Sequence, residues 1–217
     1  MRIELKELFE EVDNCEECRI SKNRLQHILG GGKEIGPKAM FVFINPTHRN
    51  ITSKPEYSGK RFPFIGTTNL WKIFVDAGLL ENSLLDRIHD AEFVINSIDE
   101  KGFYFTNLVK CTQTNADLPN MKTINKKIDL LMREINIVNP KLIVTFGTLP
   151  FGTLAKQKLK LSEHYKKQLK SKRLITYKSK NILEKNYKIF PCYFPVGRGR
   201  KKEALKLLKI LKNNLNK

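Results

Sequence analysis

The chain has 217 residues, 41% hydrophobic and 29% charged, which suits one soluble domain with a single sizeable core. No run approaches the roughly 20 apolar residues that cross a bilayer, and residues 1–15 are amphipathic instead of signal-like, so we expect a cytoplasmic protein with no membrane partner. Forty Lys and Arg against 22 Asp and Glu give a formal charge of +18, which predicts a polyanionic partner unless it only reflects a Lys-rich proteome.

Short apolar runs alternate with helical patterns along the chain, which is the order of an α/β fold. Strands are predicted at 39–44, 102–109, 141–147, 173–179 and 187–194, of which 173–179 is the weakest. Helices are predicted over residues 1–15 and at 69–80, 123–138, 149–157 and 201–215. The first strands are apolar nearly throughout, as in parallel strands covered on both faces. We therefore expect a three-layer α/β/α sandwich with a central, mostly parallel sheet.

One domain over residues 1–217 is predicted, because no linker or internal repeat divides the chain. Residues 1–36 contain the N-terminal helix and a Cys-x2-Cys pair. Residues 156–186 are Lys-rich without a clear period and predict a basic surface excursion. The sequence GGGK at 30–33 predicts a flexible loop, and it is no phosphate-binding P-loop because the Gly-Lys-Ser/Thr pattern is missing.

Unusual residues stand where the predicted parallel strands end. Ligands of such sheets bind beyond the carboxyl ends of the strands. The residues found there are Asn45, Pro46, Asn107, Gly147 and Gly197. The sequence therefore predicts a ligand site at this edge of the sheet.

The four cysteines are not expected to form disulfides, because the cytoplasm keeps thiols reduced. Cys15 and Cys18 follow the first helix at a spacing that lets two thiolates bind one metal ion or one side of a cluster. Cys111 ends the sequence TNLVKC, and Cys192 lies in FPCYFP. The alternative is a metal-free pair with two buried thiols.

Four ordered segments resemble the uracil-DNA glycosylase superfamily: FINP (43–46), GKRFPFIGTTNLW (59–71), FTNLVKC (105–111) and FPVGRGR (194–200). The first is similar to the Gly-Ile-Asn-Pro-Gly motif of mismatch-specific thymine/uracil glycosylases. The PFIG stretch, the Cys-x2-Cys pair and TNLVKC are more similar to the iron-sulfur uracil-DNA glycosylases. The resemblance covers most of the chain and implies a DNA glycosylase of base excision repair, with DNA as partner and a 4Fe-4S cluster as cofactor. We expect it to act as a monomer.

The resemblance assigns Asn45 to hold the water that attacks C1′, and a positioned water can suffice for an oxocarbenium-like transition state. Pro46 stiffens the adjoining backbone. Phe64 would stack on the flipped base, and the amide of Asn107 would donate to O4 and accept from N3–H of uracil, a pattern that cytosine reverses. The alternatives are ordinary ones: asparagines that close turns, and phenylalanines, Phe62 included, that fill a core.

The last motif predicts contacts with the DNA backbone. Gly197 and Gly199 let the main chain approach phosphates, and the following helix offers N–H groups to an anion. The cations expected at the phosphates are Arg198, Arg200, Lys201 and Lys202. One of the two arginines is predicted to fill the gap that the flipped base leaves. A solvated basic helix start is the alternative.

Three departures from the resemblance limit what it implies. Phe194 stands where many relatives have a histidine, so no imidazole from that position stabilises the leaving uracil anion. Phe43 and Thr47 replace the glycines that flank the Ile-Asn-Pro motif, so the base preference is not carried over. Residues 112–140 contain no cysteine, which leaves Cys192 as a fourth ligand, a cluster with three thiolates, or no cluster.

These observations predict an enzyme that flips uracil from DNA and hydrolyses the N-glycosidic bond, with a guanine opposite, thymine and other deaminated bases left open. A non-catalytic nucleic-acid-binding iron-sulfur protein on the same scaffold is the alternative, and it would release no base. A small-molecule nucleotide hydrolase would have no use for a charge of +18.

Overall fold

The computed structural model describes residues 2–15, 25–114, 117–180, 185–197 and 199–215. Its centre is a six-stranded sheet with the order β1-β3-β2-β4-β6-β5. Four strands run parallel: β2 (Ala39–Phe43), β3 (Phe103–Asn107), β4 (Ile143–Phe146) and β6 (Lys188–Cys192). The edge strands β1 (Gly31–Gly32) and β5 (Tyr177–Lys178) are antiparallel additions. The predicted α/β architecture with a mostly parallel sheet is confirmed.

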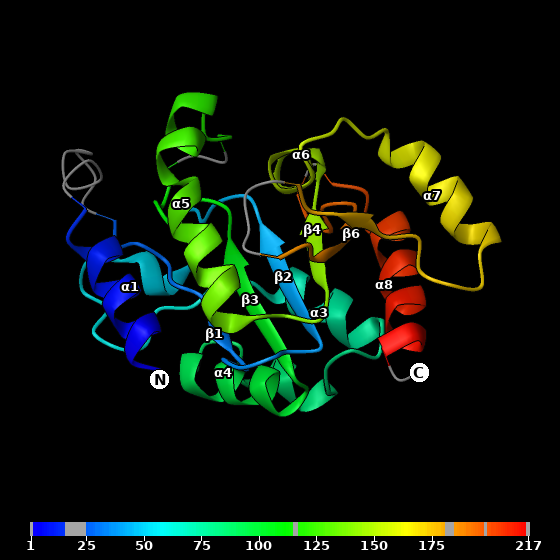
Figure 1. The fold of residues 1–217 in the computed structure, drawn as a ribbon. Helices are drawn as coiled ribbons and strands as arrows, with labels where there is room; N and C mark the ends of the chain where they lie inside the picture. The colour runs from blue at the N-terminus through cyan, green and yellow to red at the C-terminus, as the bar shows by residue number, and fades with distance from the viewer. Residues whose placement is uncertain (1, 16–24, 115–116, 181–184, 198, 216–217) are drawn as a thin grey trace.

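Helices cover both faces of the sheet (Figure 1). One face carries α1 (Ile3–Asp13), α5 (Met121–Val138) and α6 (Thr148–Ala155), and the other carries α3 (Thr68–Asp76), α4 (Ala91–Glu100) and α8 (Lys201–Leu215). Successive strand residues point to opposite faces. Met40 and Val42 therefore enter the core cluster beneath α1, α5 and α6, whereas Phe41 and Phe43 enter the core cluster beneath α3, α4 and α8. No helix in the described part of the chain is long and apolar enough to cross a membrane.

The predicted strands and helices are present, with ends shifted by a few residues. The sequence analysis missed α4 and two 3-10 helices, η1 (Ile51–Ser53) and η2 (Asn82–Arg87). It was also wrong about residues 30–33, because Gly31 and Gly32 pair with β3 instead of forming a flexible loop. Gly32 has a φ of +106°, and a Cβ there would collide with the carbonyl oxygen of Phe103, so the close approach requires glycine.

A further helix, α7 (Leu161–Lys170), forms inside the segment 156–186, where no helical period was predicted. Its buried face includes His164 and Gln168, which read as surface residues in a hydropathy pattern. The Gln168 side chain folds the segment back on itself, because Nε2 donates to the Arg173 carbonyl at 3.0 Å and Oε1 accepts from Ile175 N–H at 2.8 Å. Hydrogen bonds of a buried polar side chain therefore help to hold this helix, which lacks a regular apolar pattern.

The pairing of β2 and β3 continues past the ends of both strands. Leu108 N–H donates to the Phe43 carbonyl at 2.8 Å, and Val109 N–H donates to the Ile44 carbonyl at 3.0 Å. Further on, Gln113 N–H donates to the carbonyl of Pro46 at 3.0 Å. The two loops consequently run alongside each other, which places Asn45 and Asn107 at the same edge of the sheet.

Candidate active site

Asn45 lies half-buried directly after β2, and main-chain carbonyls orient its amide. Its Nδ2 donates to the Pro46 carbonyl at 3.1 Å and makes a longer contact of 3.4 Å with the Asp117 carbonyl. Turning the amide over would place its oxygen against both carbonyls, so the chemistry fixes which atom is nitrogen. Oδ1 therefore remains as an acceptor on the other side of the amide, where it can orient a water molecule.

Asn107, the last residue of β3, is only 1% exposed. Neither Oδ1 nor Nδ2 of this side chain has a hydrogen-bond partner within the described residues. An amide buried without partners costs on the order of 1–3 kcal/mol for each unsatisfied group. Such a cost is consistent with a ligand that supplies both a donor and an acceptor in the plane of the amide.

Phe64 has a half-buried ring and a main chain in an unusual conformation. Its φ of +62° is uncommon for a residue with a Cβ, and its carbonyl accepts hydrogen bonds from Trp71 Nε1 at 3.0 Å and from Thr67 N–H at 2.9 Å. These two donors hold the strained backbone in place. The neighbouring Phe62 is fully buried, so the core interpretation is correct for Phe62.

The ring of Phe43 lies between the ring of Phe64 and that of Phe194 in the last motif. Its ring meets Phe64 edge-on with centroids 4.6 Å apart, stacks on Phe146 at 4.4 Å, and lies 6.4 Å from the ring of Phe194. In the sequence Phe43 stood out only as a departure from glycine, and its contacts with the other aromatic rings were not predicted. The sequence offered one signal for these contacts, because Phe43 is an aromatic residue at the end of an entirely apolar strand.

Glycines shape the loop between β6 and α8. Gly197 has a φ of +61° and is exposed, so a Cβ would strain the backbone there. At Gly199 a Cβ would collide with the Phe194 carbonyl oxygen, while Gly199 N–H donates to the Val196 carbonyl at 3.0 Å. The loop is thus a tight turn in which these two positions require glycine.

The cations of this motif differ in their surroundings. Lys201 and Lys202 are exposed in the first turn of α8. The Arg200 guanidinium lies 5.5 Å from the centre of the Tyr193 ring and 3.6 Å from a carboxylate oxygen of Glu203. Arg198 lies outside the described residues. The two lysines are therefore well placed to meet phosphates at the helix N-terminus.

Cys15 and Cys111 lie on the face of the sheet that carries α1 and α5, in a region that we call the cysteine corner. The half-buried Sγ of Cys15 accepts a hydrogen bond from Lys127 Nζ of α5 at 2.8 Å. Cys111 packs against the same core cluster as α1, and it is disulfide-bonded, contrary to the expectation that all thiols are reduced. Cys18 falls outside the part of the chain that is described.

The structure does not bring Cys192 to this corner. Its side chain is fully buried in the core cluster on the opposite face of the sheet, where Sγ lies 3.9 Å from the Ala204 carbonyl oxygen. Burial raises the pKa of the Cys192 thiol, which disfavours the thiolate that iron requires. Among the described residues, no three His, Cys, Asp or Glu side chains are grouped so that they could hold a metal ion.

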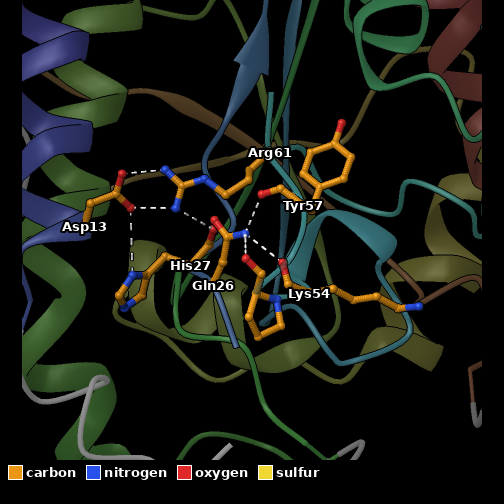
Figure 2. A network of polar contacts seen from close by, with 7 residues as sticks. Asp13, Gln26, His27, Lys54, Tyr57 and Arg61 are labelled. Atoms are coloured by element: carbon orange, nitrogen blue, oxygen red, sulfur yellow. Dashed lines mark hydrogen bonds and ion pairs between the residues drawn. The ribbon is translucent and has the colours of Figure 1, made fainter. Parts of the chain in front are cut away.

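A polar network connects the end of α1 to the segment that leads to Phe64 (Figure 2). The Arg61 guanidinium binds both carboxylate oxygens of Asp13, with Nη1 and Oδ1 2.7 Å apart. Nearby, Gln26 Nε2 donates to the carbonyls of Lys54 at 2.6 Å and Tyr57 at 2.7 Å. The segment before Phe64 is consequently anchored to the end of α1.

The sequence of the chain is similar to those of known proteins of one superfamily. The family model described as "Uracil DNA glycosylase superfamily" matches residues 29–215, from before β1 to the end of α8. The Type-4 uracil-DNA glycosylase of Sulfurisphaera tokodaii is 26% identical over 196 residues, which is 89% of this chain and 74% of that protein. The enzyme of the same name from Archaeoglobus fulgidus is 26% identical over 144 residues, 66% of this chain and 59% of that protein. The extent of the family match shows that the chain belongs to the uracil DNA glycosylase superfamily.

Proposed function

We propose that this protein is a DNA glycosylase that flips uracil out of DNA and hydrolyses its N-glycosidic bond. The observation that carries the proposal is the buried amide of Asn107, because neither of its polar atoms has a partner in the part of the chain that is described. The uracil edge offers the O4 acceptor and the N3–H donor that this amide needs, whereas cytosine offers the reverse pattern. A fixed amide would therefore bind uracil and leave polar groups unpaired against cytosine.

In this mechanism the ring of Phe64 stacks on the flipped base, a contribution of roughly 1–3 kcal/mol that favours no particular base. Asn45 Oδ1 accepts a hydrogen bond from a water and directs its lone pair at C1′. The C1′–N1 bond breaks, uracil leaves as an anion with the bonding electrons, and the water oxygen bonds to C1′. The proton that this water loses passes to solvent, from which the uracil anion takes up a proton. The products are free uracil and an abasic site.

The contact with DNA is proposed to run along the loop before α8. Gly197 and Gly199 keep side chains away from the approaching backbone, while Lys201 and Lys202 supply charge beside the helix N–H groups. The high positive charge of the whole chain would add a sequence-independent attraction for DNA.

The cofactor part of the proposal is a 4Fe-4S cluster held by thiolates of Cys15, Cys18 and Cys111. The chemistry of the donor set supports it, because sulfur atoms are the usual ligands of such clusters. Cys111 can serve only after its disulfide is reduced, and Cys192 is left out because it is buried in the other core cluster. The cluster would have a structural role, tying the N-terminal helix to the loop after β3.

An assay of abasic-site formation tests the function directly. We expect uracil release from single-stranded, U·A and U·G oligonucleotides, while a T·G duplex reports whether thymine is also accepted. DNA binding without release from any of the four would support the non-catalytic alternative.

The Asn107→Asp variant tests the reading of the base. We expect slower uracil excision, because a carboxylate cannot donate to O4, together with new release of cytosine, whose amino group it can accept from. If both Asn107→Asp and Asn107→Ala excise uracil at the parental rate, another residue reads the base.

A further inference from the structure

A fully buried ion pair between Lys110 and Glu134 adjoins the main chain of Asn107. Lys110 is 3% exposed and Glu134 of α5 is 0% exposed, and Lys110 Nζ lies 2.5 Å from Glu134 Oε2. The remaining acceptor sites of the carboxylate are also used, because Tyr104 OH donates to Oε1 at 2.9 Å and Thr106 Oγ1 donates to Oε2 at 2.9 Å. The carboxylate is thus paired and hydrogen-bonded throughout.

Stability alone is a weak reason for such a pair. Removing two charges from water costs several kcal/mol per ion, and well-packed apolar residues often replace buried ion pairs without loss. The pair therefore calls for a role that an apolar pair could not fill.

A further interaction of the ammonium indicates that role. Lys110 Nζ donates to the main-chain carbonyl of Asn107 at 3.0 Å. Strand β1 pairs with β3 only at Tyr104 and Phe105, so β1 does not extend alongside Asn107. The ammonium thus provides a partner for the carbonyl of the last strand residue, and it closes the turn from 107 to 110.

The side chain of Asn107 cannot orient itself before a base arrives, because neither of its polar atoms has a partner among the described residues. Its direction must come from the main chain and from packing. We propose that Lys110 and Glu134 are positioning residues, which fix the main chain of Asn107 so that its amide is already aligned for the edge of the base. This inference rests on the proposed function.

The pair has to be replaced as a pair, because removing Lys110 alone would leave Glu134 buried and uncompensated. The variant Lys110→Met with Glu134→Gln removes both charges, and the new amide can still bond Tyr104 and Thr106. We expect it to fold, as judged by thermal unfolding, and to excise uracil about tenfold or more slowly in single turnovers. If it does not fold, Lys110→Gln with Glu134→Gln carries the same test, since the two amides can bond each other.

The decisive measurement repeats the replacement in an Asn107→Ala background. A positioning role predicts little further loss there, below about twofold, because the group being positioned is already absent. Equal losses in both backgrounds would show that the pair supports the fold without acting through Asn107, and would overturn the inference.

A control variant tests whether the effect is specific, and the Asn107→Ala variant distinguishes failure of the proposed function from failure of the positioning role. Gln168→Met removes a buried polar side chain of α7, and it should lower the unfolding midpoint without changing excision in either background. An Asn107→Ala variant with parental excision would overturn the base-reading function and the positioning role together. A slow Asn107→Ala variant that shows no coupling to the pair would overturn only the positioning role.

Discussion

Two asparagines at the same sheet edge differ in how their amides are held. The donors of Asn45 are directed at main-chain carbonyls, so its oxygen has a fixed direction before any substrate arrives. The buried amide of Asn107 has no hydrogen-bond partner among the residues that the structure describes. One amide is therefore suited to hold a small, exchangeable water, and the other to bind a group that brings its own donor and acceptor.

Replacing Asn45 with Ala should slow single-turnover excision by on the order of 100-fold or more while DNA affinity stays nearly unchanged, because only the placement of water is lost. Rapid-quench kinetics and a binding titration measure the two quantities. Asn50→Ala is the matched control, since Asn50 caps η1 through Thr52 N–H and its loss should lower stability by about 1 kcal/mol without slowing the chemistry. Parental excision by the Asn45 variant would remove this residue from the mechanism.

At the scale of single elements, α7 is held by a buried histidine. His164 Nδ1 lies 3.3 Å from Tyr177 OH, its ring packs edge-on against Phe190 with centroids 5.6 Å apart, and burial lowers its pKa to about 4. The unfolded chain therefore binds a proton at His164 between pH 6.5 and about pH 4, whereas the folded chain does not.

Stability should accordingly fall as the pH is lowered from 6.5 toward about 4. Thermal unfolding across this range measures the effect. His164→Phe should remove part of the dependence, because no group then has to stay neutral inside the core. An unchanged pH profile in that variant would mean that other groups cause the loss.

The start of α8 should act on DNA through individual charges. Lys201→Gln and Lys202→Gln should each reduce the slope of log affinity against log salt by about one unit without changing which base is released. Lys166→Gln and Lys167→Gln on the exposed side of α7 are the control, because they carry equal charge but lie beside no glycine turn. Equal effects of the α8 and α7 variants would indicate that DNA responds to the overall positive charge and makes no particular contact at the start of α8.

The proposal that an arginine fills the gap left by a flipped base is tested in a related way. Arg198→Ala and Arg200→Ala are compared on duplex and on single-stranded substrate, because only the duplex leaves a gap. The variant that is slowed more on duplex marks the residue. Arg200 already has contacts with Tyr193 and Glu203, so we expect the larger duplex effect at Arg198.

At the scale of the whole molecule, the sequence predicted the layers but not every connection. Apolar strands and amphipathic helices carry their own pattern, so β2, β3, β4, β6, α5 and α8 were found. Helix α7 was missed because its buried face contains polar residues, and β1 was missed because its pairing depends on glycine approaching another strand. Such elements are decided by tertiary contacts that no local pattern records.

Some residues of the candidate site could be predicted from the sequence, and others could not. Asn45, Phe64 and Asn107 stand out because polar or isolated aromatic residues follow apolar strands or prolines. Lys110 and Glu134 do not stand out, since an ion pair between residues 24 positions apart becomes visible only when β3 and α5 are packed together.

The cysteine corner joins segments that are far apart in the chain, and it gives a whole-molecule prediction. Protein purified without oxygen under reducing conditions should be brown and contain roughly stoichiometric cluster iron. Cys15→Ser and Cys111→Ser should lose that iron, whereas Cys192→Ser should keep it. Iron analysis and the visible spectrum measure the outcome; zinc in a colourless protein would change the metal, and neither metal would end the cluster proposal.

The left-handed backbone of Phe64 has a consequence for how this chain would evolve. A glycine at position 64 would adopt the observed φ of +62° without strain, but it would present no ring. The same substitution would remove the edge-on contact between the ring and Phe43, so relief of backbone strain and loss of packing oppose each other at position 64. A chain under selection for stability would keep the aromatic ring for as long as its packing contributes more than the strained backbone costs.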